Sequence, residues 1–152
     1  MKPIEDRLKN TKPIENRSER ALLNIMHTGS CLRNVANEAL KGYDLTDSQY
    51  NVLRILRGQQ GKPMNLFEIV SRMVHRDSNV SRIVDKLELK GLVERKVDEK
   101  NRRRVDITIT PAGIELLQSI QPALISSIEA TFSALKAEEI ELLDTLLNKL
   151  RD

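Results

Sequence analysis

Apolar residues recur along most of this chain at the three- and four-residue spacing of amphipathic helices. One apolar stripe predicts a short helix capped at its start by Asn65, and a second predicts a helix over residues 77–91. The first stripe consists of Leu66, Ile69, Val70 and Met73, and the second of Val80, Ile83, Val84 and Leu87. Residues 74–76 leave room for only a tight turn between these two helices.

The spacing changes to strict alternation after Gly91, which predicts a β-hairpin. Its strands are expected over residues 92–97 and 104–110, and a polar, arginine-rich loop joins them. In the second strand Val105, Ile107 and Ile109 alternate with polar residues, as in a strand with one buried face. Two short helices followed by an arginine-tipped hairpin make up a winged helix-turn-helix.

Longer helices are predicted on both sides of this core. The first begins near a Ser18 cap and runs to about Lys41. Thr46 and Gln49 have the spacing of a capping box and begin the next helix, which leads into the core. After the hairpin, a helix starts at Thr110 and should bend at Pro122, and a leucine-rich helix ends the chain.

These flanking helices carry more apolar residues than one small domain can cover, which predicts a homodimer. We therefore expect a mainly α protein with a small β-hairpin wing. Its winged helix-turn-helix core occupies residues 45–110, and dimerisation helices occupy residues 18–44 and 111–152. Residues 1–17, with two prolines in a near-repeat, are expected to form an arm that orders only against a partner subunit.

Positive charge is concentrated on the segment that contains the second helix and the hairpin of the predicted winged helix-turn-helix. Residues 72–104 hold 11 Lys/Arg against 6 Asp/Glu, whereas the rest of the chain holds 14 against 16. The net charge of +3 alone would say little about partners, but a basic segment that coincides with the motif favours nucleic acid. A solvated basic surface is the alternative.

Composition limits the remaining classes of protein. The 152 residues suit one domain, and no apolar run is long enough for a membrane span or placed as a signal peptide. A cytoplasmic protein is expected. Its single cysteine, Cys31, cannot form an internal disulfide. No phosphate-binding glycine loop, nucleophile elbow or paired-carboxylate motif is present, so neither an enzyme nor a cofactor is expected.

The core resembles the DNA-binding region of the MarR/SlyA family of winged-helix regulators. The resemblance rests on Ser78-x-Val80-Ser81-Arg82, Leu87-Glu88-x-x-Gly91-Leu92-Val93-Glu94-Arg95, Asp98-x-x-x-Arg102-Arg103 and Ile109-Thr110-x-x-Gly113. Two positions depart from the family pattern. Asn101 replaces an acidic residue before the arginine pair, and Val70 replaces a small residue in the first helix of the motif.

Double-stranded DNA is therefore the expected partner, read by the helix over residues 77–91. Residues on its polar face that are expected at base edges are Ser78, Asn79, Ser81 and Arg82. Arg76 and Lys86 are expected at phosphates. Of the wing arginines, Arg102 or Arg103 is expected in the minor groove, and Arg104 is a further candidate for DNA binding. The alternatives are a solvated helix face, a solvated turn and, for Arg82, an ion pair with Asp77 or Asp85.

The resemblance also implies a repressor of a palindromic operator that is released by a small aromatic or amphipathic effector. Candidate effector-binding residues are Met26, His27, Ser30, Tyr50 and Arg54, with core packing as their alternative. DNA binding without sequence preference, or binding of another macromolecule, is a further alternative. His27 and Cys31 share a helix face but are too few for a metal site. Cys31 is expected to be a buried structural thiol, with redox sensing as the alternative.

Overall fold

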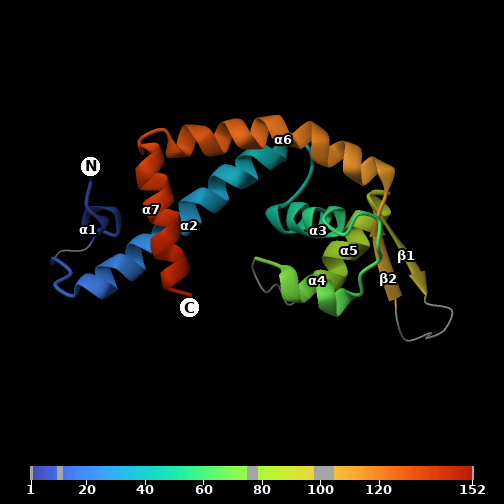
Figure 1. Ribbon diagram of the computed structural model, residues 1–152, viewed down its shortest axis with the longest axis horizontal. Helices are drawn as coiled ribbons and strands as arrows, with labels where there is room; N and C mark the ends of the chain where they lie inside the picture. The colour runs from blue at the N-terminus through green and yellow to red at the C-terminus, as the bar shows by residue number, and fades with distance from the viewer. Residues whose placement is uncertain (1, 10–11, 75–78, 98–104, 152) are drawn as a thin grey trace.

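The structure, a computed structural model, describes residues 2–9, 12–74, 79–97 and 105–151. Its elements are, in chain order, α1 (Ile4–Arg7), α2 (Arg17–Lys41), α3 (Asp47–Arg57), α4 (Leu66–Arg72), α5 (Val80–Leu89), β1 (Val93–Val97), β2 (Val105–Ile109), α6 (Pro111–Phe132) and α7 (Ala137–Lys149). Figure 1 shows an elongated molecule in which α3, α4, α5 and the hairpin form a lobe at one end. Helices α2 and α7 lie toward the other end, and α6 spans the two. This is the mainly helical architecture with a small hairpin that the sequence predicts.

Reciprocal side-chain caps fix where α3 and α4 begin. The Thr46 hydroxyl accepts a hydrogen bond from the Gln49 backbone N–H at 3.2 Å, and Gln49 Oε1 accepts one from the Thr46 N–H at 3.0 Å. Asn65 and Glu68 make the same exchange at the start of α4, at 3.0 and 2.8 Å. Each pair satisfies two N–H groups that a helix start leaves without partners. The predicted capping box of Thr46 and Gln49 and the predicted Asn65 cap are both confirmed.

The core of the lobe is built from the apolar stripes of its helices. On α5, Val80, Val84 and Leu87 are buried, and each of them is at most 2% exposed. They pack in one cluster with the buried residues of α3 and α4, and burying a side chain of this kind contributes roughly 1.5–3 kcal/mol. This burial confirms the predicted inner stripe and turns the polar side of α5 outward.

The hairpin is joined along one edge to the segment that leads into α4. Strands β1 and β2 are antiparallel, with Val93 opposite Ile109 and Val97 opposite Val105. Ile107 points inward and is 1% exposed. Its backbone exchanges two hydrogen bonds with Met64, at 2.8 and 3.0 Å, just before α4 begins. The entry to α4 therefore extends the edge of the hairpin.

Helix α6 begins against the hairpin and leads away from it. Thr110 caps the helix through the Gly113 N–H, at 3.1 Å, with a proline in the first turn as predicted. Gly113 is needed there because a Cβ atom would lie 2.4 Å from the Leu92 carbonyl oxygen. The helix continues through Pro122, and Figure 1 shows it change direction partway along. Tyr43 donates a hydrogen bond to the Ser119 carbonyl, at 3.1 Å, and fastens the end of α2 to α6.

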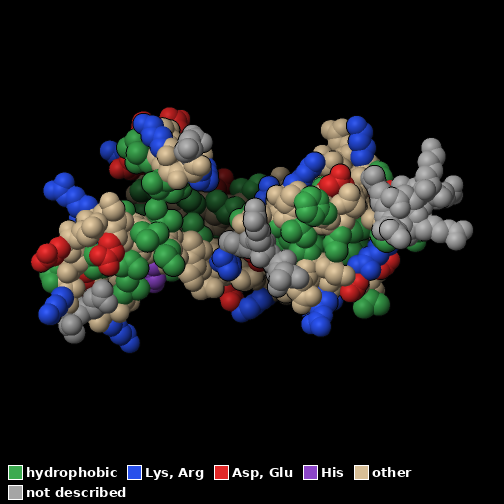
Figure 2. Space-filling model, turned by 90° about the horizontal axis from the view of Figure 1, so that it is seen from below, with side chains coloured by type: hydrophobic (Ala, Val, Ile, Leu, Met, Phe, Trp, Pro, Cys, Tyr) green, Lys and Arg blue, Asp and Glu red, His purple; other side chains and the backbone are tan. Residues whose placement is uncertain are grey.

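The outer faces of α2 and α7 are apolar and uncovered in the single chain. No residue of α7 is buried, and Leu142 and Leu146 are 57% and 50% exposed. On α2, Leu22 and Met26 are 56% and 63% exposed. Figure 2 shows hydrophobic side chains gathered at the end of the molecule that holds these helices.

Two predictions for the first part of the chain are wrong. The cap of α2 is Asn16, not Ser18, since Asn16 Oδ1 accepts hydrogen bonds from the N–H groups of Ser18 and Glu19, at 2.9 and 3.1 Å. The arm was expected to order only against a partner subunit, yet Ile4 and Ile14 are 3% and 9% exposed within a single chain.

Across the described ranges, no helix has the length and apolar character needed to cross a membrane.

Candidate nucleic-acid interface

The polar face of α5 lies on the surface of the lobe. Asn79, Ser81, Arg82 and Lys86 are all exposed, while the opposite stripe is buried. Asn79 stands at the N-cap position, but its side chain makes no capping hydrogen bond. Among the described residues its amide has no hydrogen-bond partner, so it can bond a ligand there. Six residues on or just before this helix were predicted to contact DNA, and the structure brings four of them together on one exposed face.

Arg82 has no hydrogen-bond or ion-pair partner in the part of the chain that the structure describes. Of the two acidic partners considered for it, Asp85 is bound instead by Arg95, and Asp77 lies outside the described residues. A guanidinium that is exposed and unpaired among its described neighbours can form a bidentate contact with a base or a phosphate.

Arg95 braces α5 against the hairpin. Its guanidinium, on β1, lies 2.6 Å from an Asp85 carboxylate oxygen and 3.5 Å from one of Glu88. It also donates a hydrogen bond to the Ser81 carbonyl, at 3.2 Å. Arg95 belongs to the family motif in the sequence, but this role could not be predicted there, because the contact depends on how the strand crosses the helix. The polar face of α5 is thus held in a fixed orientation relative to the wing.

The remaining predicted DNA contacts cannot be placed. Arg76 and Ser78, before α5, and the wing residues Arg102, Arg103 and Arg104 lie outside the described residues. The hairpin is described up to the pair formed by Val97 and Val105. The wing arginines therefore remain predictions.

Two of the five predicted effector residues line a cavity of about 330 Å³ between α2 and α3. Tyr50 and Arg54 line it, with the Arg54 guanidinium 5.9 Å above the Tyr50 ring, whereas Met26, His27 and Ser30 do not. Leu32, Asn51 and Met73 also line this cavity. They were missed because they come from three separate helical segments. A second cavity, of about 210 Å³, lies against α6 and shares Tyr50 and Arg54.

The prediction of a buried thiol is wrong. Cys31 is exposed on α2, with its Sγ atom 3.7 Å from His27 Nε2. Over the ranges that the structure covers, no three His, Cys, Asp or Glu side chains gather closely enough to hold a metal ion.

A helix with an exposed polar and cationic face, braced against a β-hairpin on a buried helical support, defines a winged helix-turn-helix DNA-binding protein. The sequence pattern of the MarR family matches residues 43–104. The HTH-type transcriptional regulator YkoM of Bacillus subtilis (strain 168) is 34% identical over 111 residues, which cover 72% of this chain and 70% of that protein. The chain belongs to the MarR family of transcriptional regulators and binds DNA.

Other relatives agree with this assignment. The transcriptional repressor MprA of Escherichia coli (strain K12) is 27% identical over 125 residues, which cover 82% of this chain and 71% of the repressor. Among solved structures, BpsR of Bordetella bronchiseptica superposes with a TM-score of 0.75 at 24% identity, covering 84% of this chain and 96% of that one. The structure of BpsR is described as showing how 6-hydroxynicotinic acid regulates its DNA binding. The relatives are regulators, not enzymes.

Proposed function

We propose that this protein is a homodimeric repressor that binds a palindromic operator and is released by a small-molecule effector. The observation that carries the proposal is the exposed face of α5, where Arg82 lies beside Asn79 and Ser81 with no described partner. In this function, Arg82 pairs with guanine and Asn79 with adenine in the major groove. Lys86 contacts a phosphate and so positions the helix, and Arg102, Arg103 and Arg104 follow the minor groove.

The uncovered apolar faces support the proposed dimer. Residues of α7 such as Leu142 and Leu146 are at least half exposed, and they lie on a helix whose residues are all solvent-accessible in one chain. A second copy would cover these faces. The units of the protomer are then the arm of residues 1–17, the dimerisation region of residues 18–44 and 111–152, and the reading region of residues 45–110. Two α5 helices related by a twofold axis would read a palindrome with half-sites about one helical turn apart.

The cavity between α2 and α3 supports effector control, since it joins the proposed dimerisation region to the reading region. Arg54 and Tyr50 at its wall offer a cation and an aromatic face, which suit a small aromatic acid. BpsR provides a precedent among similar structures. An effector that favours one spacing of the two α5 helices would disfavour the DNA-bound form by its difference in affinity for the two forms.

DNA selection followed by footprinting tests the proposal. Sequences recovered from a random pool should contain two inverted half-sites, and the purified protein should protect both. Affinity should fall steeply with salt, with a slope in log–log form of about −0.9 per phosphate contacted. Recovery of sequences without a shared motif, at the same affinity as bulk DNA, would point to non-specific binding and contradict the proposal.

Release through Cys31 is a second candidate, favoured by the exposure of its thiol beside His27. Alkylation with N-ethylmaleimide would then weaken operator binding in the wild type and leave Cys31→Ser unaffected. Equal operator affinity before and after alkylation of the wild type excludes this candidate.

A further inference from the structure

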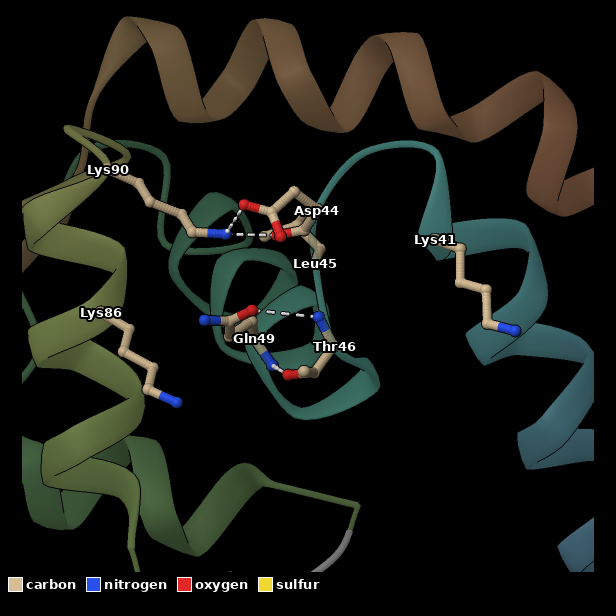
Figure 3. A pocket seen from close by; sticks show the side chains of 7 residues that line it. All are labelled: Lys41, Asp44, Leu45, Thr46, Gln49, Lys86 and Lys90. Atoms are coloured by element: carbon tan, nitrogen blue, oxygen red, sulfur yellow. Dashed lines mark hydrogen bonds and ion pairs between the residues drawn. The ribbon is translucent and has the colours of Figure 1, made fainter.

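A cavity of about 430 Å³ lies on the side of α5 that faces α2, away from the cavity assigned to the effector. It is bounded by the end of α2, the turn into α3, the first turn of α3 and the second half of α5. Figure 3 shows Gln49 between α5 and α2, with Lys86 extending toward it from α5 and Lys90, the residue after α5, reaching Asp44. Three lysines, Lys41, Lys86 and Lys90, and one carboxylate, Asp44, contribute to its lining.

The amide of Gln49 is the most informative group in this cavity. Gln49 is 5% exposed, and among the described residues it is the one polar residue that is buried. Its Oε1 atom accepts the capping hydrogen bond from the Thr46 N–H, at 3.0 Å, which identifies the other end of the amide as the NH₂ group. That nitrogen has no protein partner in the described chain, and Figure 3 shows it pointing toward α5 and Lys86. Among the described residues no side-chain nitrogen or oxygen closed off from solvent lacks a partner, so this nitrogen is reached from the cavity and can donate a hydrogen bond to a ligand that enters it.

The charges around this amide have the sign that suits an anion. Lys90 donates hydrogen bonds to Asp44, at 2.8 Å to Oδ2, and to the Asp44 carbonyl. Lys41 pairs with Glu38 at 2.5 Å, outside the cavity. Lys86 has no ion-pair partner in the described chain. The cavity therefore combines one ammonium without an ion-pair partner among the described residues, a second ammonium shared with an exposed carboxylate, and an N–H donor on a side chain that is otherwise buried.

We propose that this cavity binds a small oxyanion, a phosphate or carboxylate group, between Gln49 Nε2 and the ammonium groups of Lys86 and Lys90. Each of these groups donates and none accepts, so an anion with several oxygen atoms satisfies all three. Gln49 is 5% exposed, which favours a small molecule able to enter the cavity over a phosphate held in the backbone of duplex DNA. A bound anion would join α5 to the first turn of α3.

Occupancy has a consequence for DNA binding, and this consequence rests on the proposed function. Lys86 is the residue of α5 proposed to contact a DNA phosphate. An anion that holds Lys86 in the cavity removes that contact, so affinity for DNA falls and the salt slope becomes shallower by about 0.9. The anion would thereby act as an effector at a place distinct from the cavity of Tyr50 and Arg54.

Titration of the DNA-free full chain with inorganic phosphate tests the binding step, at constant ionic strength with chloride as the replaced anion. Nitrogen–proton NMR spectra should show the side-chain NH₂ signals of Gln49 shifting with saturation, together with backbone signals at the start of α3 and the end of α5. Because no DNA is present, this result does not depend on how an operator is recognised.

Gln49→Glu is the decisive variant. A glutamate still completes the capping box at the start of α3, but it replaces the NH₂ group with a negative oxygen. Phosphate affinity should fall by about tenfold or more. Lys86→Gln should weaken binding by about fivefold. Lys62→Gln, which removes the same charge from an exposed turn outside the cavity, should leave the affinity within about twofold of the wild-type value.

Two results would overturn the proposal. One is saturable phosphate binding that Gln49→Glu leaves unchanged, because the anion would then bind elsewhere. The other is an absence of saturable phosphate binding to the wild type. If Gln49→Glu and Lys86→Gln then still weaken DNA binding and reduce its salt slope, the cavity belongs to the DNA interface. Unfolding of Gln49→Glu is monitored by its melting temperature, and Lys86→Gln, on an exposed position, provides the test if the cap variant is unstable.

Discussion

The guanidinium of Arg95 on β1 lies 2.6 Å from the carboxylate of Asp85 on α5. A single arginine thus connects the hairpin to the proposed reading helix, and it also bonds the Ser81 carbonyl on that helix. Both side chains are partly exposed, at 26% and 47%, so solvent screens the ion pair and limits its contribution to stability. Its main effect is on the orientation of α5.

Arg95→Ala should therefore weaken operator binding although Arg95 faces α5. We expect a loss of about 0.5–1 kcal/mol in unfolding free energy, and a drop of about fivefold in DNA affinity, equivalent to roughly 1 kcal/mol. Urea unfolding and fluorescence anisotropy with labelled operator measure the two quantities. Lys96→Ala, on the same strand with a side chain 77% exposed, is the control for stability. An unchanged DNA affinity in Arg95→Ala would show that the brace does not orient α5.

Gly113→Ala should destabilise the fold by about 1–3 kcal/mol. The added Cβ atom would lie 2.4 Å from the Leu92 carbonyl oxygen and 2.8 Å from Ile109 Cγ1, and the backbone atom cannot move without disturbing the start of α6. Gly29→Ala is the matched control, because nothing lies within 4 Å of its added methyl group and it sits inside α2. That change should stabilise by up to about 1 kcal/mol. Equal melting temperatures for the two variants would contradict the close approach of α6 to the hairpin.

Replacing Lys90 should change how the stability of the protein depends on pH in the acid range. The hydrogen bond and the charge of Lys90 hold the pKa of the Asp44 carboxyl below its ordinary value of 3.8. A carboxyl whose pKa is lowered by folding stabilises the protein above that ordinary value and loses this effect as the pH falls through the folded pKa. In Lys90→Met the pKa of Asp44 should rise toward 3.8, and the stability difference from wild type should shrink at lower pH. Carbon-detected NMR titration of the carboxyl group measures this, and an unaltered pKa would exclude the pairing in solution.

The apolar face of α7 makes dimerisation testable without disturbing the monomer. Leu143→Glu combined with Leu146→Glu changes residues that are already 38% and 50% exposed in one chain, so the protomer should remain folded. Light scattering should give a mass twice the 17.3 kDa of the chain for the wild type and a single-chain mass for the variant. Lys149→Glu alters the net charge by the same amount on the same helix, and it should stay dimeric. A single-chain mass for the wild-type protein would contradict the proposed dimer.

Much of the fold could be predicted because helix caps and apolar stripes depend only on residues that are close together in the sequence. The capping pair of Thr46 with Gln49 and the buried stripe of Val80, Val84 and Leu87 needed only spacing. The cap of α2 was misplaced because Asn16 and Ser18 are both good caps, and the backbone conformation decides between them. Contacts between distant segments, such as Arg95 with Asp85, could not be found by spacing alone.

The same distinction applies to the candidate sites. The exposed face of α5 follows from helical periodicity, so Asn79, Ser81 and Arg82 could be selected from the sequence. The oxyanion cavity could not, since Gln49 and Lys86 meet only when α5 packs beside the start of α3. The exposure of Cys31 was missed because α2 carries apolar residues on more than one side, whereas one chain leaves much of that helix uncovered.

The most direct test of DNA reading by α5 is to select binding sites from a random DNA pool with the wild type and with Arg82→Ala. The wild type should recover an inverted repeat with one strongly preferred base pair per half-site that depends on Arg82. The variant should lose the preference at that position, keep the others, and bind the wild-type operator about 1–3 kcal/mol more weakly. Recovery of the same motif with the same affinity by Arg82→Ala would contradict the assignment of the α5 surface as the reading face.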